Sequence, residues 1–185
     1  MVTAKRFTST DLGLMPDDSK RYEIIAGQLY VSGQPSVEHQ YACSRLSQFL
    51  GDWNDVDNSG VVLTAPGLIF AEDDDVAPDV VWIKRERLVS TIDRAGHLQS
   101  APELVIEVLS PGKANENRDR QAKLKLYSRR GVLEYWIVNA MQQQVEVYRR
   151  KPARLMLAAT LHTGDPLTSP PLPGFSCPVV MLFFA

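Results

Sequence analysis

Hydrophobic positions recur with two different spacings along this chain, and each spacing predicts a type of secondary structure. In RYEIIAGQLYVSG, two β-type runs flank Ala26–Gly27, which predicts a β-hairpin near the N-terminus. Apolar residues then fall at helical spacing over residues 36–53, which predicts an amphipathic helix. A short helix is also expected at residues 9–15. The expected order of these first elements is a short helix, a hairpin and a long helix.

The remaining pattern predicts a sheet with strands of mixed direction. Residues 61–85 hold two or three short β-runs, separated by acidic and proline-containing turns such as residues 73–75. Residues 103–109 follow as a largely apolar strand, and a charge-rich helix is expected from about Asn115 to Arg130. Three more strands are expected, and then a Pro-rich loop with a short apolar end; the strand ranges are 133–139, 143–150 and 155–160. The expected fold class is α/β, with a central mixed β-sheet flanked by helices.

Composition is that of an ordinary globular protein. The chain has 185 residues, 44% of them hydrophobic and 23% charged, which suits one domain over residues 1–185. No signal peptide is visible, and the longest apolar run is too short to cross a bilayer. The two cysteines, Cys43 and Cys177, have no metal-ligand or redox spacing. We therefore expect a cytoplasmic protein that does not associate with membranes.

The charge of the chain limits how it can bind nucleic acid. A net charge of -2 argues against a broadly basic nucleic-acid-binding surface. Residues 113–130 nevertheless carry an excess of basic side chains. That segment is either a local basic patch or the solvated face of a helix.

Two carboxylates interrupt apolar strands. In ELVIEVL, Glu107 shares one face of the strand with Glu103, while the other face is wholly apolar. Asp79 enters the apolar run VVWI directly after Pro78. If the two strands are neighbours, Asp79 and Glu107 converge, and two convergent carboxylates favour a hard cation such as Mg²⁺. The alternative is that these acids lie at strand ends and contact water or an arginine.

The helix after this strand places a lysine on its apolar side. At 100° per residue, Lys123 falls within an apolar arc, whereas three basic residues fall outside it. The arc consists of Ala122, Leu124, Leu126 and Tyr127, and the excluded residues are Arg118, Lys125 and Arg129. A lysine on a core-facing side needs an anion, and the strand carboxylates are one source. An ordinary helix pair with Asp119 is the other.

Three segments in order along the chain carry a resemblance. PDVVWI, PELVIEVLSP and DRQAKLKLYSRRGVLEYWIVN resemble the Uma-two family of restriction endonucleases, which is placed in the PD-(D/E)xK nuclease superfamily. RYEIIAGQLYVSGQPSVEHQ and LPGFSCPV are similar to the opening and closing segments of that family. The resemblance implies a restriction-endonuclease-like core and a metal-dependent phosphodiesterase site.

The resemblance also implies which residues form that site. Asp79 matches the aspartate of the PD element, and Glu107 matches the acid of the second motif. The superfamily's usual lysine would stand at position 109, where this chain has Leu109. The family instead shows a helical pattern D-x-x-x-K-x-x-x-Y, which is matched by Asp119, Lys123 and Tyr127. Lys113, in the loop after the strand, is a weaker candidate for the lysine.

The implied reaction is phosphodiester hydrolysis with Mg²⁺, for which Mn²⁺ could substitute. Asp79, Glu107 and the backbone carbonyl of Val108 would hold the metal. Lys123 would orient the water or neutralise developing charge. Glu23 matches a further acid of the family and is either a third carboxylate of the site or a surface residue of the hairpin.

Two other polar residues have open roles. His39 could serve the site or be a half-buried structural histidine. Glu103 is either a supporting acid or the exposed start of its strand.

Three classes of function compete. The leading hypothesis is an endonuclease acting on DNA as a two-fold homodimer. The second is a nucleic-acid-binding module on the same fold with little or no hydrolytic activity. The third is an assembly protein in which Asp79, Glu107 and Lys123 form only a buried ion cluster.

Overall fold

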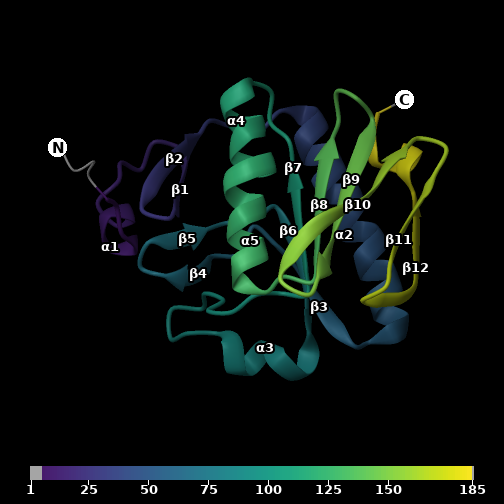
Figure 1. Cartoon of the computed structure of the whole chain (residues 1–185), viewed down its shortest axis with the longest axis horizontal. Coiled ribbons are helices and arrows are strands. Elements are labelled where there is room, and N and C mark those ends of the chain that lie inside the picture. Colours follow the sequence, from purple (N-terminus) through teal and green to yellow (C-terminus); the bar gives the residue numbers. More distant parts are fainter. Residues whose placement is uncertain (1–5, 185) are drawn as a thin grey trace.

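The computed structural model describes residues 6–184, and a six-stranded mixed sheet forms its centre (Figure 1). The strand order is β10-β9-β8-β7-β6-β3. Only β7 and β8 pair in parallel, and every other neighbouring pair in this sheet is antiparallel. The expected mixed α/β architecture is thus confirmed. Its strands are β3 (Gly60–Thr64), β6 (Val80–Lys84), β7 (Leu104–Val108), β8 (Glu134–Asn139), β9 (Gln144–Lys151) and β10 (Arg154–His162).

Two smaller sheets flank the central one. The first has the order β2-β1-β5-β4 and includes the hairpin predicted around Ala26–Gly27. Its strands are β1 (Arg21–Ile25), β2 (Gln28–Ser32), β4 (Leu68–Ala71) and β5 (Asp74–Val76). The second is a hairpin of β11 (Pro166–Ser169) and β12 (Leu172–Pro178), followed by a 3-10 turn, Val179–Leu182. The predicted Pro-rich loop is therefore wrong at the C-terminal end: Pro170 and Pro171 form the turn of a hairpin, and Pro173 and Pro178 lie at exposed positions of β12.

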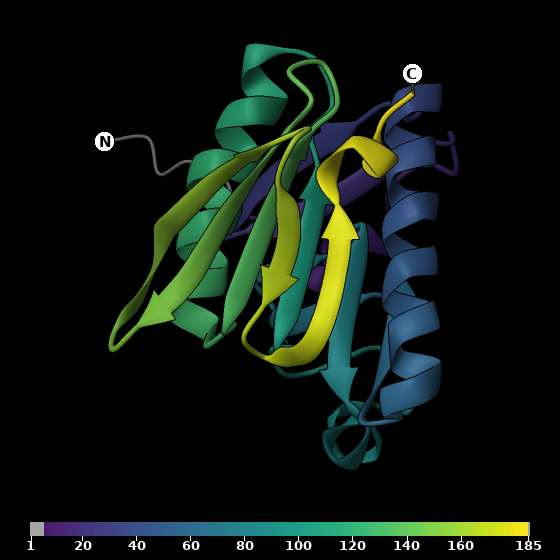
Figure 2. The ribbon, with the colours of Figure 1, turned by 90° about the vertical axis from the view of Figure 1, so that its right-hand side faces the viewer.

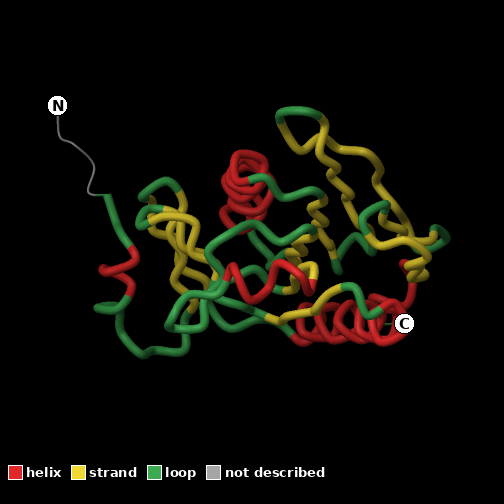
Figure 3. Tube along the Cα trace, turned by 90° about the horizontal axis from the view of Figure 1, so that it is seen from below, coloured by secondary structure: helices red, strands yellow, loops and turns green. Residues whose placement is uncertain are grey.

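The two longest helices lie on opposite faces of the central sheet, as Figure 3 shows from below. α2 (Val37–Asp57) packs on one face together with the β11–β12 hairpin, which Figure 2 shows beside it. The helix that connects β7 to β8 packs on the other face with the four-stranded sheet. Two short helices are α1 (Ser9–Leu12) and α3 (Arg85–Thr91), the second of which the sequence pattern did not predict.

The connecting helix is not a regular α-helix throughout. It consists of α4 (Lys113–Asn117), a π-helical segment (Arg118–Lys123) and α5 (Leu124–Arg130). Gly131 follows it in a left-handed conformation with φ 97°, so the helix ends at Arg130 as predicted. A π-helical turn contains more residues than an α-helical turn, so the helix face shifts within this segment.

The alternation expected in β7 is present. Leu104, Ile106 and Val108 join the core cluster on the α2 side, whereas Val105 joins the cluster on the α5 side. Glu107 shares the face of Val105 and therefore points toward α5. Most of the predicted strands and helices lie within a few residues of the observed ones. The predicted turn at 73–75 differs: it ends at Asp73, two residues earlier, and Asp74 begins β5.

Candidate active site

Asp79 lies at the start of β6, beside the C-terminal end of β7. Its carboxylate is buried, and Oδ2 accepts a hydrogen bond of 2.9 Å from the backbone N–H of Val108. Oδ1 lies 2.9 Å from Nη1 of Arg21, and Oδ2 lies 3.1 Å from Nε2 of His39. Burial would raise the pKa of Asp79, but His39 and the cationic Lys123 and Arg21 hold the pKa well below its usual range. Asp79 is therefore an ionised carboxylate.

Glu107 lies on the adjacent strand and faces the connecting helix. Its Oε1 accepts a hydrogen bond of 2.8 Å from the hydroxyl of Tyr127 and lies 2.9 Å from Nζ of Lys123. Burial raises the pKa of Glu107 to about 8, and the negative charge of Asp79 adds to this despite the opposing effect of Lys123. Glu107 thus carries a proton that an added cation would displace.

Lys123 is fully buried, as its place in the apolar arc predicts. Its Nζ lies 2.9 Å from Oε1 of Glu107 and 2.9 Å from Oε1 of Glu23, with Asp119 Oδ1 at 4.0 Å. Burial alone would lower the pKa of Lys123, but the carboxylates, with Glu107 first, hold that pKa above its usual range. Lys123 is therefore a buried ammonium between carboxylates rather than the partner of Asp119 alone.

Glu23 is buried too, so the interpretation of Glu23 as a surface hairpin residue is wrong. Oε1 accepts a hydrogen bond of 3.0 Å from the N–H of Ala77, because β1 runs beside β5. Oε2 has no hydrogen-bond partner among the described residues, and Nε of Arg118 lies 4.0 Å from it. A buried carboxylate oxygen without a donor is costly, so this end of the cluster is short of hydrogen-bond donors.

Arg118 joins the cluster from the π-helical segment. It binds Asp119 with two N–H groups, at 2.8 Å to Oδ1 and 3.2 Å to Oδ2, and donates to Oγ of Ser32. The helical spacing had placed Arg118 outside the buried arc, and that prediction is wrong. The π-helical turn is the reason, because the 100° step does not hold across it.

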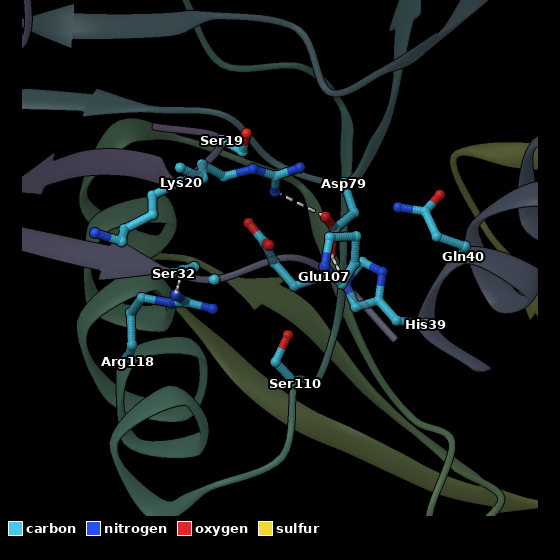
Figure 4. A pocket seen from close by; sticks show the side chains of 12 residues that line it. Ser19, Lys20, Ser32, His39, Gln40, Asp79, Glu107, Ser110 and Arg118 are labelled. Atoms are coloured by element: carbon cyan, nitrogen blue, oxygen red, sulfur yellow. Dashed lines mark hydrogen bonds and ion pairs between the residues drawn. The ribbon is translucent and has the colours of Figure 1, made fainter. Parts of the chain in front are cut away.

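A pocket of about 320 Å³ opens onto Asp79 and Glu107 (Figure 4). Three basic side chains line it, together with several hydroxyl and amide groups. The basic residues are Lys20, Arg21 and Arg118, and the polar residues are Ser19, Ser32, His39, Gln40 and Ser110. The pocket therefore has carboxylates in its wall and cationic groups around them, which suits a phosphate group bound next to a metal ion.

His39 reaches the site from the first turn of α2. Ser36 caps this helix by accepting a hydrogen bond of 3.3 Å from the N–H of His39. The imidazole is buried, with Nε2 facing Asp79 and Nδ1 lying 3.6 Å from Sγ of Cys43. The structure therefore places His39 in contact with a predicted site residue.

The charges of this cluster indicate whether a cation fits. Among the described residues, four acidic side chains meet three permanent cations, so the charges balance while Glu107 is protonated, and its ionisation leaves one negative charge in excess. The carboxylates are Glu23, Asp79, Glu107 and Asp119, and the cations are Arg21, Arg118 and Lys123. The two carboxylates that line the pocket offer hard oxygen donors, which Mg²⁺ prefers. The donor set thus fits a divalent cation, and so does the negative charge that appears when Glu107 loses its proton.

Three other sequence candidates lie away from the pocket. Glu103, directly before β7, accepts a 2.9 Å hydrogen bond from the N–H of Lys84 and pairs with Arg87. The interpretation of Glu103 as the exposed start of its strand is therefore wrong. Lys113 is exposed at the start of α4 and does not line the pocket. Leu109, at the position of the usual lysine, is buried in the apolar core.

Sequence reasoning missed Arg21, which pairs with Asp79. A signal was available, because Arg21 stands two residues before Glu23 and strand side chains alternate, so both point to one face. Cys43 was also missed as a neighbour of the site, although it stands one helical turn after His39.

Comparisons with known proteins agree with this fold. A structure described as "a putative nuclease belonging to DUF820 from Anabaena variabilis ATCC 29413" superposes with a TM-score of 0.73 at 16% identity, over 95% of this chain and 97% of that chain. The type IIG restriction endonuclease BpuSI reaches a TM-score of 0.43 at 14% identity, over 72% of this chain and 15% of its own. The second likeness is too low to carry an argument, and no curated protein matches the sequence.

No helix in the described range 6–184 is long and apolar enough to span a membrane.

The sequence itself matches one family over residues 10–180, under the description "Putative restriction endonuclease". This match covers most of the chain and agrees with the restriction-endonuclease-like core. The chain belongs to the Uma2 family.

Proposed function

We propose that this protein is a Mg²⁺-dependent endonuclease that hydrolyses phosphodiester bonds of DNA. The observation that carries the proposal is the pair Asp79 and Glu107, which line one pocket from adjacent strands. Lys123, on the helix that connects β7 to β8, contacts Glu107 directly. Membership of a family described as restriction endonucleases supports the same reaction class.

Asp79, Glu107 and the backbone carbonyl of Val108 would hold the metal ion. The N–H of Val108 already binds Asp79, so the backbone of Val108 lies next to the carboxylate pair. When bound, Mg²⁺ would polarise the scissile phosphate and make a water molecule more acidic. Mn²⁺ offers the same charge and accepts the same oxygen donors, so it should substitute.

The surrounding residues have distinct roles in this proposal. Tyr127 donates to Glu107 and, with Lys123, fixes the orientation of that carboxylate. Lys123 also favours the ionised form of Glu107, which is the form that binds a cation. Arg21 and Arg118 line the pocket, where guanidinium groups can bind phosphate oxygens in pairs.

The basic residues of the pocket compensate for the mildly acidic chain. A net charge of -2 cannot hold DNA by overall attraction, so binding would depend on local contacts. A two-fold homodimer would present one pocket to each strand of a duplex. Sedimentation or light scattering with and without duplex DNA would test that dimer.

A second function deserves a test because Asp79 is already fully paired. Arg21, His39 and the N–H of Val108 all bind its carboxylate. Such pairing is also expected of an inactive binding or assembly module whose charges only stabilise the fold.

Thermal unfolding with and without Mg²⁺ or Mn²⁺ separates the two functions. We expect millimolar metal to raise the melting temperature of the wild type but not of Asp79→Asn or Glu107→Gln, since a ligand stabilises only the state that binds it. Glu103→Gln is the matched control, because it alters a buried acid of the same strand outside the pocket. Equal behaviour of all four proteins with and without metal would exclude the metal site and favour the inactive module.

A further inference from the structure

A second group of metal-ligating side chains adjoins the pocket. His39, Cys43 and Asp79 each offer one ligand atom, and these atoms all lie within 4.8 Å of one another. His39 and Cys43 stand one turn apart on α2, and Asp79 faces them from the start of β6. The ligand atoms of a tetrahedral ion with bonds of about 2.0–2.3 Å lie about 3.3–3.8 Å apart, so small side-chain movements would bring these three atoms around one ion.

These three donors favour a different class of cation from the carboxylate pair. Thiolate and imidazole are soft or borderline ligands that select Zn²⁺ and similar transition metals, whereas Mg²⁺ takes oxygen donors. Three protein ligands leave one position of a tetrahedral ion open to water. The imidazole can contribute one nitrogen only, and each of its nitrogens already faces one of the other two ligands.

The group is accessible from its own side of the molecule. A second pocket of about 350 Å³ is lined by Cys43, Ser44, Ser47 and Thr64, and it shares Arg21, His39, Gln40 and Asp79 with the first pocket. Glu107 and Arg118 line only the first pocket, and Cys43 lines only the second. Asp79 thus lies between two openings, with Glu107 as its carboxylate partner on one side and Cys43 as the added donor on the other.

We propose that His39, Cys43 and Asp79 form a site for a Zn²⁺-class cation, and that occupation of this site withdraws Asp79 from the Mg²⁺ pair. The existence of the Zn²⁺ site is independent of the proposed nuclease function, whereas the antagonism with Mg²⁺ rests on it. Binding would convert the Cys43 thiol to a metal-bound thiolate and release its proton to solvent. No oxidant or reductant takes part in this exchange.

The sulfur of Cys43 lies 3.6 Å from Nδ1 of His39, and a cysteine binds Zn²⁺ as its thiolate. Zinc binding should therefore release about one proton per ion near neutral pH, a release that calorimetry in two buffers can measure.

The first test uses Co²⁺ as a spectroscopic substitute for Zn²⁺. The wild type should bind one Co²⁺ with a thiolate-to-cobalt charge-transfer band, and Zn²⁺ should displace it. Cys43→Ser and Cys43→Ala should lose the band and bind Zn²⁺ at least about 100-fold more weakly. Changes to residues that only support a ligand weaken metal binding by up to about 100-fold, and loss of the ligand itself should cost at least as much. Cys177→Ser is the matched control, because Cys177 is the other cysteine of the chain and lies in the apolar core.

Retention of the band in both Cys43 variants would overturn the proposal, as would its equal loss in Cys177→Ser. Glu107→Gln separates this proposal from the nuclease function, because Glu107 belongs only to the Mg²⁺ pair. We expect this variant to lose the thermal response to Mg²⁺ but to keep the cobalt spectrum. In the wild type, Zn²⁺ should abolish the Mg²⁺-dependent response, and additive effects of the two ions would contradict the shared use of Asp79.

Discussion

The ammonium of Lys123 lies 2.9 Å from Oε1 of Glu107, and it reaches that carboxylate from the helix that follows the strand. In the superfamily pattern that the sequence resembles, the lysine follows the acid on the same strand. Here that position holds Leu109, which contributes to the core beneath the helix. The positive charge is thus supplied from the layer that packs on the sheet, so the packing of the connecting helix determines where it lies.

Removal of this ammonium should destabilise the fold. Lys123→Met keeps the length of the side chain but leaves Glu23 and Glu107 without their shared cation. Breaking a buried ion pair by removing one partner costs about 3–5 kcal/mol. Urea denaturation should show this loss, whereas Lys125→Met, at an exposed position of the same helix, should change the free energy of unfolding by less than about 0.5 kcal/mol. A loss below that limit in Lys123→Met would contradict the buried cluster.

The raised pKa of Glu107 predicts how metal binding depends on pH. Its carboxyl has a pKa of about 8 in place of 4.5, so the folded state keeps a proton that the unfolded state loses between these values. The free energy of unfolding of the metal-free protein should therefore fall as pH rises through this window. Mg²⁺ affinity should rise by about tenfold per pH unit below about 8 and then level off, because metal and proton compete.

Calorimetric titrations at several pH values would measure that slope. Glu107→Gln cannot bind the proton, so its stability should lack the corresponding fall over the same window. An affinity for Mg²⁺ that does not change between pH 6 and 8 would contradict the displacement of a proton from Glu107 by the metal.

Arg21 competes with any cation that approaches Asp79, since its guanidinium lies 2.9 Å from Oδ1. Arg21→Met should therefore bind Mg²⁺ more tightly than the wild type and cleave DNA more slowly, because a phosphate-binding group is lost. Calorimetry and a plasmid-nicking assay measure the two effects. Lys113→Met is the control, because Lys113 is an exposed cation outside the pocket. Weaker Mg²⁺ binding in Arg21→Met would contradict the competition.

Gly60 is required by the close approach of Trp82 on the neighbouring strand. A Cβ at position 60 would overlap the ring atoms Cε2 and Cζ2 of this indole, which is buried in the core. Gly60→Ala should therefore lower the free energy of unfolding by about 1–3 kcal/mol, the usual cost of overpacking. Gly51→Ala, with open space around its added Cβ, should not lower it. Thermal or urea denaturation of the two variants would test this difference.

The sequence pattern predicted the strands and helices well where one periodicity continued for several turns. α2 is the clearest example, because it buries one regular face, and β7 was recognisable as a mostly apolar run that is buried on both faces. The pattern failed at the C-terminal hairpin, where prolines indicated a loop. In a two-stranded sheet each strand has a free edge, and proline is tolerated there.

The candidate site was predictable only in part. Asp79, Glu107 and Lys123 were identifiable because each is a charged residue among apolar ones, and burial makes such residues unusual. Arg21 and Arg118 carried no such mark, since a charge near a hairpin end or on a polar helix face is ordinary. Their contacts depend on how the hairpin and the helix pack against the sheet, and local spacing does not contain that information.

The π-helical segment Arg118–Lys123 has a consequence for the lengths of related chains. It lets the helix hold one more residue than a regular α-helix would between the same two ends. A relative with a regular helix at this point should therefore align with a single-residue gap between Arg118 and Lys123. In such a relative, the residue aligned with Arg118 should face solvent, and the loss of one buried cation should accompany the loss of one buried acid.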